Sequence, residues 1–173
     1  MHKECLEFMT RITKTLDIRD KYVLDVGGRN VNGSIKDLFA GCAGYTTLDH
    51  VEGRGVDIVG DLYVWTPPFQ MDIVICTEVL EHVVDPRLAM HRMYHWLKPG
   101  GVLIMTCATS GRKPHTATGH TLIEGTEPYQ NVLPSELELY GDYDIEINAQ
   151  HKDLYVVWRK PGLAKNGTFG QTL

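Results

Sequence analysis

Short apolar runs that alternate with amphipathic stretches are the feature that most narrowly limits the fold of this chain. Residues 22–26, 71–76 and 102–107 are apolar runs of strand length, bounded by glycine, proline or polar residues. Residues 3–17 and 86–97 instead place apolar side chains at the three- and four-residue steps of a helix face. Strands that alternate with helices predict a mainly parallel α/β sheet with helices on both of its faces.

The remaining segments refine this prediction. The apolar runs at residues 143–147 and 154–158 are joined by a short polar connection, which predicts an antiparallel hairpin. Between the predicted strands 44–48 and 56–59, residues 50–55 are too few for a normal helical crossover. The helix there is therefore expected to be missing or reduced to a turn. Residues 32–34 can cap a helix through residues 35–39, and Pro134 opens another short helix. The predicted strands are 22–26, 44–48, 56–59, 71–76, 102–107, 143–147 and 154–158.

Length and composition describe an ordinary globular domain. The chain has 173 residues, and we expect residues 1–160 to form one domain and residues 161–173 to form a loose tail. The net charge of −5 argues against a nucleic acid as the main partner. No apolar run approaches the roughly 20 residues of a membrane span, so we expect no membrane partner. The four cysteines show neither a zinc nor a disulfide pattern, which favours the reducing cytoplasm.

Glycines and a carboxylate follow the first two predicted strands, where ligands of open α/β sheets bind. Gly27 and Gly28 follow the first strand, and glycine there allows a sharp turn and a close approach of a ligand to the backbone. Asp49 ends the second strand, where it is placed to accept hydrogen bonds from both hydroxyls of a ribose. Each feature alone also fits an ordinary turn or a solvated carboxylate, whereas together they have the spacing that one bound nucleoside requires.

The glycine loop does not match a nicotinamide dinucleotide site. The dinucleotide fingerprint is G-x-G-x-x-G, and no starting point within residues 27–33 provides it. Counted from Gly27, Arg29 stands where the second glycine lets a pyrophosphate approach the backbone. A nicotinamide-dependent oxidoreductase is therefore disfavoured.

Five further runs lie in order along residues 22–108. They are Val23-Leu24-Asp25-Val26-Gly27, Thr47-Leu48-Asp49, Gly60-Asp61-Leu62, Glu78-Val79-Leu80-Glu81-His82-Val83 and Leu97-Lys98-Pro99-Gly100-Gly101. With these runs the chain resembles the class I S-adenosylmethionine-dependent methyltransferases, of the type 11-like group. The resemblance implies a Rossmann-like, mainly parallel seven-stranded sheet with an antiparallel last strand, helices on both faces and a reduced periphery. It also implies S-adenosylmethionine as the cofactor.

Carried over position by position, the resemblance distributes the cofactor along the strand ends. It places Asp25 and Gly27 at the methionine part, Asp49 at the ribose, Asp61 and Leu62 at the adenine, and Thr77 and Glu78 beneath the sulfonium. Gly28, Arg29 and His50 complete the residues expected to bind the cofactor. Arg29 departs from the family pattern, which has its second glycine here. An arginine facing the cofactor carboxylate is chemically sensible, and a structural role for Arg29 is the alternative.

A general base is needed only if the methyl acceptor is a hydroxyl or a protonated amine, and histidine suits that role near pH 7. His82, close after the fourth strand, is the first candidate. His115 and His120 in the following long segment come next, and His50 is a further candidate. Each of these histidines also fits a packing role or a solvent-exposed position.

Two other histidines have a spacing that can bind a metal ion. His91 and His95 lie one helical turn apart on a predicted helix. Metal sites need three or four ligands, and no third ligand is in register with this pair. We therefore expect no metal site. Glu78 and Glu81 are also compatible with a plain electrostatic role at a helix start.

Residues 110–131 form a polar segment that is too long for an ordinary connection and is therefore suspected of function. The segment follows the fifth strand and faces the same crevice, so we expect it to act as a substrate lid. Its hydroxyls, its histidines and Tyr129 suit a small-molecule or sugar-like acceptor. The chain has few residues beyond the minimal fold, which excludes a large built-in substrate domain. A homodimer is therefore possible, in which the partner subunit contributes part of the acceptor site.

The sequence therefore predicts an enzyme that transfers the methyl group of S-adenosylmethionine to a small or polar acceptor by in-line displacement. The alternative is a non-catalytic S-adenosylmethionine-binding module that regulates a partner or serves as a scaffold. The absence of an unambiguous base in the sequence motivates this alternative. Turnover across a broad panel of acceptors distinguishes the two.

Overall fold

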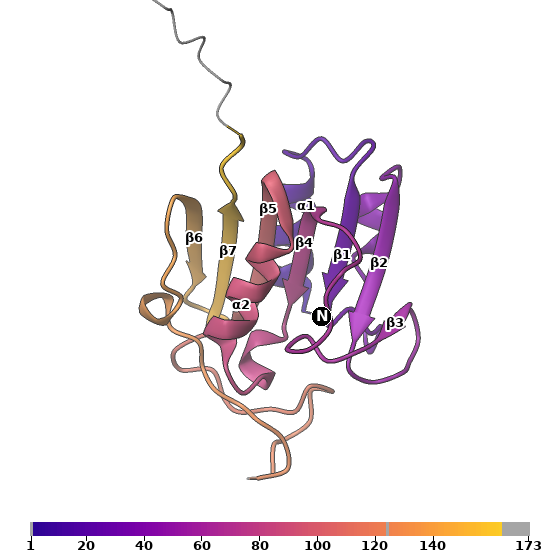
Figure 1. The fold of residues 1–173 in the computed structure, drawn as a ribbon. Helices are drawn as coiled ribbons and strands as arrows, with labels where there is room; N and C mark the ends of the chain where they lie inside the picture. Colours follow the sequence, from indigo (N-terminus) through magenta and orange to yellow (C-terminus); the bar gives the residue numbers. More distant parts are fainter. Residues whose placement is uncertain (1, 124, 164–173) are drawn as a thin grey trace, which may run out of the picture.

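The structure is a computed structural model that describes residues 2–123 and 125–163 (Figure 1). Its two α-helices are α1 (Lys3–Thr13) and α2 (Pro86–His95), and its 3-10 helices are η1 (Lys36–Phe39), η2 (Leu80–His82) and η3 (Pro134–Glu136). Its strands are β1 (Tyr22–Val26), β2 (Gly44–Asp49), β3 (Ile58–Val59), β4 (Met71–Thr77), β5 (Leu97–Ala108), β6 (Asp142–Asn148) and β7 (Asp153–Arg159).

The strands of the described residues form one seven-stranded sheet in the order β3-β2-β1-β4-β5-β7-β6. Strands β1 to β5 run parallel to one another, whereas β7 is antiparallel to both β5 and β6. In Figure 1 the arrow of β7 accordingly points opposite to those of β1, β2 and β4. The predicted sheet with an antiparallel last strand is confirmed. Its strand order reverses between β1 and β4, which is where ligands of such sheets bind.

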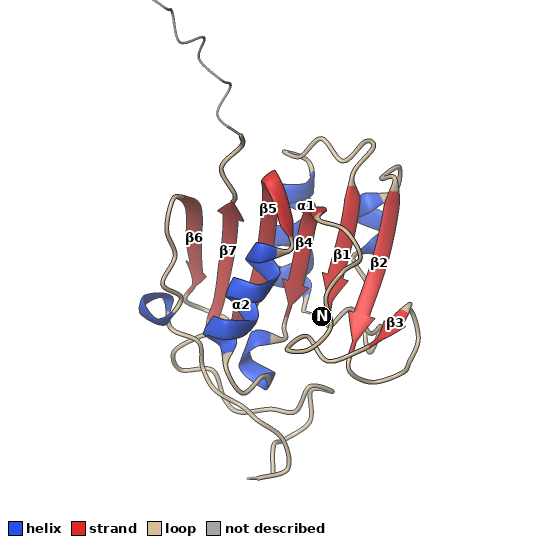
Figure 2. Cartoon of the chain, viewed as in Figure 1, coloured by secondary structure: helices blue, strands red, loops and turns tan. Residues whose placement is uncertain are grey.

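Helices cover both faces of the sheet, as predicted (Figure 2). On one face, Cys5, Phe8 and Met9 of α1 pack together with Phe39 of η1 against the inner strands. These α1 residues follow the three- and four-residue spacing that defines one helix face. The ring of Phe8 stacks on that of Tyr155 with 4.6 Å between centroids.

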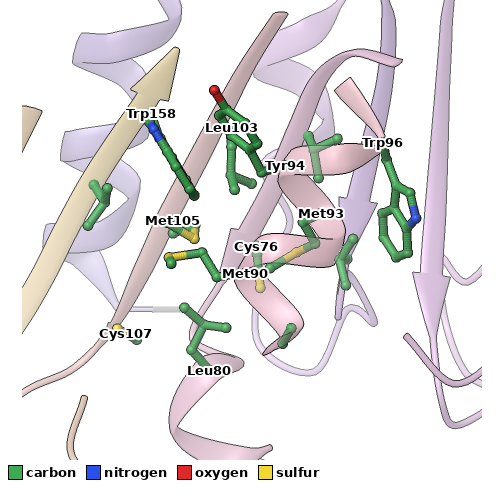
Figure 3. Packing of buried hydrophobic residues seen from close by; sticks show 14 of the residues in the cluster. Cys76, Leu80, Met90, Met93, Tyr94, Trp96, Leu103, Met105, Cys107 and Trp158 are labelled. Atoms are coloured by element: carbon green, nitrogen blue, oxygen red, sulfur yellow. The ribbon is translucent and has the colours of Figure 1, made fainter. Parts of the chain in front are cut away.

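Helix α2 covers the other face, and its start matches the expected cap. The Asp85 side chain accepts a hydrogen bond of 2.9 Å from the backbone N–H of Leu88, and Pro86 occupies the first helical turn. Figure 3 shows Met90 and Met93 of α2 pointing toward the sheet. Many side chains in this layer are fully buried, and each Å² of apolar surface removed from water stabilises the fold by about 25 cal/mol.

The helix and strand limits that differ most from the prediction each have a local reason. The first helix ends at Thr13 rather than at residue 17, since threonine hydroxyls bond back to the carbonyls of Met9 and Ile12 around its end. The expected helix over residues 35–39 is only the single turn η1, whose first residue has no side-chain cap. Strand β5 begins at Leu97 rather than at residue 102, because an irregularity in its pairing with β4 accommodates the turn at Gly100.

The periphery of the sheet is reduced, as expected. Residues 50–57 connect β2 to β3 without a helix, and the parallel strand β3 spans only two residues. Within residues 2–123 and 125–163, no helix is long and apolar enough to cross a membrane. Of the loose tail expected at residues 161–173, residues 164–173 lie outside the described residues. The domain boundary at residue 160 stays a prediction.

Candidate active site

A cavity of about 450 Å³ opens at the carboxyl ends of β1, β2 and β4. Its size falls within the roughly 300–1,000 Å³ of small-molecule sites. Ala117 and Pro128 of the long segment after β5 also line it, and Figure 1 shows this segment running past the strand ends. The lining includes every residue predicted to bind the cofactor, and His82 as well. These cofactor residues are Asp25, Gly27, Gly28, Arg29, Asp49, His50, Asp61, Leu62, Thr77 and Glu78.

The turn after β1 needs glycine at both of its first positions. Gly27 has a φ of +73°, which other residues rarely adopt, and a Cβ there would clash with Cγ2 of Val79. A Cβ at Gly28 would clash with the Asp25 carboxylate and lie 2.6 Å from Cγ2 of Thr47. The backbone of this turn, which carries no side chains at Gly27 and Gly28, therefore forms part of the cavity wall.

Replacing Gly28 with alanine is expected to destabilise the protein by about 1–3 kcal/mol, the usual cost of overpacking. The added methyl must displace Asp25 or Thr47, both of which are buried. Urea unfolding of Gly28→Ala measures this loss. Gly162→Ala is the matched control, since a Cβ at Gly162 meets no atom within 4 Å. Equal stability of the two variants would contradict the tight packing behind the turn.

Asp25 is a buried carboxylate at the cavity wall. It is 3% exposed, its Oδ2 accepts a hydrogen bond of 2.7 Å from the Tyr45 hydroxyl, and its Oδ1 has no hydrogen-bond partner. Burial raises the pKa of Asp25 to about 6, against the effect of Tyr45. A carboxylate with an unpaired oxygen on a cavity wall is suited to bind a cationic or hydrogen-bond-donating ligand group.

Asp49, at the end of β2, lines the same cavity. Its Oδ2 accepts from the backbone N–H of Arg29 at 3.2 Å, and its Oδ1 accepts from the backbone N–H of Val51 at 3.0 Å. These bonds link the turn after β1 to the end of β2 and fix the orientation of the carboxylate. Each carboxylate oxygen has a second lone pair, so both retain acceptor capacity toward the cavity. The exposed His50 lies beside it, with Nδ1 3.4 Å from Oδ1 of Asp49.

Arg29 lines the cavity, and its side-chain stem packs on the loop after β2. This packing supports the structural role considered for it, and its role toward the cofactor carboxylate stays a prediction. A Cβ at Gly53 would lie 2.7 Å from Cδ of Arg29, so this loop has glycine where the arginine crosses it. The backbone N–H of Asn30 donates to the carbonyl of Arg54 at 2.9 Å, which holds the two loops together.

The turn after β3 forms another part of the cavity wall. Oδ1 of Asp61 accepts a hydrogen bond of 2.8 Å from the backbone N–H of Tyr63, a local turn typical of aspartate. Nε of Arg92, on α2, donates to the carbonyl of Leu62 at 2.9 Å. These bonds fix the edge where the adenine is predicted to lie.

Glu78 also lines the cavity, directly after β4. Its φ of +58° is uncommon for a residue other than glycine, and such backbone strain is often found at functional sites. Its Oε1 accepts a hydrogen bond of 2.8 Å from the Thr106 hydroxyl, and its Oε2 lies 3.7 Å from Nε2 of His2. The neighbouring Thr77 also lines the cavity.

The structure separates the candidate histidines. His82 lines the cavity. The ring of His115 packs edge to face against the ring of His82, with 5.2 Å between the ring centroids. His120 is exposed in the long segment, where its backbone N–H bonds to the Thr116 hydroxyl. Burial, followed by His115, lowers the pKa of His82 to about 4, so this imidazole is neutral at pH 7. It can accept a hydrogen bond there, but it is a weak base.

Two residues of the site escaped the sequence reasoning, since Tyr45 holds Asp25 and Val79 packs against Gly27. Glu81, considered in the sequence only as a charge at a helix start, is fully buried. Tyr45 carried a signal, because it stands two residues before Thr47 and so shares the face of β2 that borders Asp25. The contact of Val79 with Gly27 depends on the path of the chain after β4, which no pattern in the sequence indicated.

Comparison with known proteins identifies the family of this fold and site. Residues 1–124 match the family described as methyltransferase domain. The chain belongs to this methyltransferase family. The matched range contains the cavity-lining residues from β1 to Ala117, so the family match and the geometry concern the same part of the molecule.

Two curated relatives carry the same name. The ubiquinone biosynthesis O-methyltransferase of Azoarcus sp. (strain BH72) is 34% identical over 141 residues, which cover 71% of this chain and 58% of that protein. The protein of the same name from Pseudomonas savastanoi pv. phaseolicola is 30% identical over 105 residues, which cover 61% of this chain and 41% of that protein. The chain thus spans about two fifths to three fifths of the length of these relatives.

Solved structures show the same fold in other methyltransferases. The N-methyltransferase NodS from Bradyrhizobium japonicum WM9, in complex with S-adenosylhomocysteine, matches with a TM-score of 0.61 and 17% identity, covering 92% of this chain and 87% of that one. The 1,6-didemethyltoxoflavin-N1-methyltransferase of Burkholderia thailandensis, with bound 1,6-didemethyltoxoflavin and S-adenosylhomocysteine, matches with a TM-score of 0.64 and 16% identity, covering 91% and 78%. At such identities the likeness concerns the fold.

Proposed function

We propose that this protein transfers the methyl group of S-adenosylmethionine to a small or polar acceptor. The observation that carries the proposal is a single cavity that Asp25 and Gly27 line together with Asp49 and Asp61. Membership of the methyltransferase family and the O-methyltransferase names of the curated relatives support it. The bound S-adenosylhomocysteine of the structural neighbours supports the cofactor.

The residues present suit this cofactor. The unpaired Oδ1 of Asp25 offers an acceptor for the amino group of its methionine part, and the bare backbone at Gly27 and Gly28 leaves room beside it. Asp49, held by two backbone N–H groups, accepts hydrogen bonds from the ribose hydroxyls. Asp61 and Leu62 border the adenine, and Thr77 and Glu78 lie beneath the sulfonium. Arg29 and His50 flank the cofactor at the cavity wall.

The reaction mainly requires that the acceptor atom be aligned with the methyl group. When bound, S-adenosylmethionine supplies a methyl group that is already activated for transfer. The protein's own residues then have to hold an acceptor atom in line with the carbon–sulfur bond, and such positioning can lower a barrier by about 7–11 kcal/mol at best. His82, the first candidate for a base, lines the cavity with a neutral imidazole, and the ring of His115 packs against it edge to face. His120 is the outer candidate for a base.

The proposals for a partner subunit and for the cellular location rest on the edge strand β6 and on the cysteines. Tyr143, Ile145 and Ile147 are 42%, 38% and 52% exposed along the edge strand β6, an apolar stripe that suits pairing with a second copy of the chain in a homodimer. Free thiols at all four cysteines favour the cytoplasm. Residues 110–131 at the cavity mouth favour a small or sugar-like acceptor.

Methyl transfer itself tests the proposal. The protein is incubated with methyl-labelled S-adenosylmethionine and a panel of phenols, vicinal diols, sugars and amines, and label is counted in the extracted products. We expect transfer to at least one hydroxylated acceptor, together with formation of S-adenosylhomocysteine. Tight cofactor binding without transfer to any acceptor would instead favour the regulatory or scaffold module.

A further inference from the structure

Glu81, His82 and His115 bring three metal-binding groups together beside the cavity. One nitrogen or carboxylate oxygen of each side chain lies within 4.8 Å of the others. Glu81 and His82 belong to η2, whereas His115 comes from the segment after β5, so the cluster joins two separate parts of the chain. Two imidazoles and one carboxylate are a common ligand set for divalent cations of the first transition row.

Two atoms of this cluster are buried polar atoms without a hydrogen-bond partner. They are Oε2 of Glu81, a residue that is 0% exposed, and Nδ1 of His82. Among the described residues, the one other buried side-chain atom in this state is Oδ1 of Asp25, at the predicted cofactor site. A buried polar group without a hydrogen-bond partner destabilises the fold. Two such atoms on adjacent residues indicate a ligand that contacts both.

The remaining atoms of the cluster are oriented as in a built metal site. Oε1 of Glu81 accepts a hydrogen bond of 3.1 Å from the backbone N–H of Ala108, which turns Oε2 away from the backbone. Nδ1 of His115 lies 3.1 Å from the carbonyl of Lys113. Since a carbonyl only accepts, Nδ1 carries the proton and Nε2 presents its lone pair. Histidines that bind metals commonly donate their second N–H to a backbone carbonyl in this way.

The burial of the cluster fits a cation. Glu81 is 0% exposed, and a buried carboxylate is stable only when it is paired with a positive charge or binds a metal ion. A dication bound by Glu81 and His82 compensates this buried charge.

We propose that Glu81, His82 and His115 bind one divalent cation of the first transition row, which in turn holds the methyl acceptor through its oxygens. Three protein ligands leave coordination positions open. His82 lines the cavity, so these positions face the space where the acceptor is predicted to bind. The existence of the cation site stands by itself, whereas its role in holding the acceptor rests on the proposed function.

The site narrows the class of acceptor. A cation with open positions binds two adjacent oxygens well, so we infer an acceptor with a hydroxyl next to a second oxygen, as in a vicinal diol or a catechol. The cation lowers the pKa of that hydroxyl, and its proton leaves to solvent. The oxygen lone pair then forms the new bond to the methyl carbon, while the carbon–sulfur bond breaks and its electron pair stays on sulfur. No strongly basic side chain is required.

Binding of Co²⁺ tests the site without reference to activity. The full chain is titrated with Co²⁺, and its visible absorption and heat of binding are recorded for the wild type, His115→Ala and His82→Gln. We expect one Co²⁺ per chain and at least about a 10–100-fold loss of affinity in each variant, since even indirect partners of metal ligands have effects of that size. His115 lies on a loop outside the sheet, so His115→Ala keeps the fold.

His95→Ala is the matched control, because it removes an exposed histidine of the surface pair on α2. Its Co²⁺ affinity is expected to equal that of the wild type. Absence of Co²⁺ binding to the wild type, or equal binding by His115→Ala, would overturn the inference. The same samples are titrated with S-adenosylhomocysteine. If that ligand binds and Co²⁺ does not, the cation site is wrong and the proposed function stands; if neither binds, the proposed function fails as well.

Discussion

Replacing Asp25 with asparagine is expected to stabilise the free protein and to weaken its binding of S-adenosylhomocysteine. In the folded protein, burial raises the pKa of Asp25 from 3.8 to about 6, so the charged carboxylate is disfavoured at pH 7. Asparagine removes this charge and still accepts the hydrogen bond from Tyr45. We expect a gain of about 1–2 kcal/mol in the free energy of unfolding at pH 7, reduced from the full shift by solvent relaxation.

The pH dependence of stability provides a second readout. Because the folded state holds the Asp25 proton more tightly than the unfolded chain, wild-type stability falls as the pH rises from about 4 to about 6 and then levels off. Asp25→Asn lacks this component, while the exposed control Asp37→Asn retains it. Urea unfolding at several pH values measures it. An asparagine variant that is less stable and binds with unchanged affinity would mean that Asp25 serves only the fold.

Replacing Asp49 with alanine is expected to weaken binding of S-adenosylhomocysteine by about 30–100-fold, or about 2–3 kcal/mol. The variant loses the acceptor predicted for the ribose hydroxyls and leaves the backbone N–H groups of Arg29 and Val51 without their carboxylate. Asp49→Asn keeps one carbonyl acceptor and should show a smaller loss. Calorimetric titration measures each affinity.

Adenosine separates the two ends of the site. Adenosine carries the ribose but lacks the methionine part, so Asp49→Ala should weaken its binding, whereas Asp25→Asn should leave it unchanged. Glu52→Ala, in the exposed loop just after Asp49, is the control for a nonspecific effect of that loop. An Asp49→Ala variant that binds both ligands like the wild type contradicts the predicted position of the ribose.

The residues at the strand ends could be predicted because local chain chemistry determines them. Gly27 has a positive φ that the turn demands, and Asp49 directly ends a buried strand, so both can be placed from neighbouring residues alone. Parallel strands bring their carboxyl ends to one edge, which is why residues distant in sequence, such as Asp25 and Asp61, line one cavity. The fold followed from the same alternation of strands and helices.

The contacts that depend on long connections could not be predicted. His115 reaches His82 through a segment without regular helix, so its position depends on contacts such as Asn131 Nδ2 with the carbonyl of Arg112 rather than on periodicity. A helix was expected where the structure has only the single turn η1. The spacing of apolar residues indicates a helix face, but it does not indicate how many helical turns form. Glu81 resembled an ordinary helix-start charge until its burial was known.

Calorimetric titration of the wild-type chain with S-adenosylhomocysteine tests the central claim most directly, because it asks whether the cavity takes an adenosyl compound at all. We expect one site per chain with a micromolar dissociation constant, about −8 kcal/mol, and no comparable binding of a nicotinamide dinucleotide. A folded protein that gives no binding heat at about 1 mM ligand, or that prefers the dinucleotide, would contradict the account.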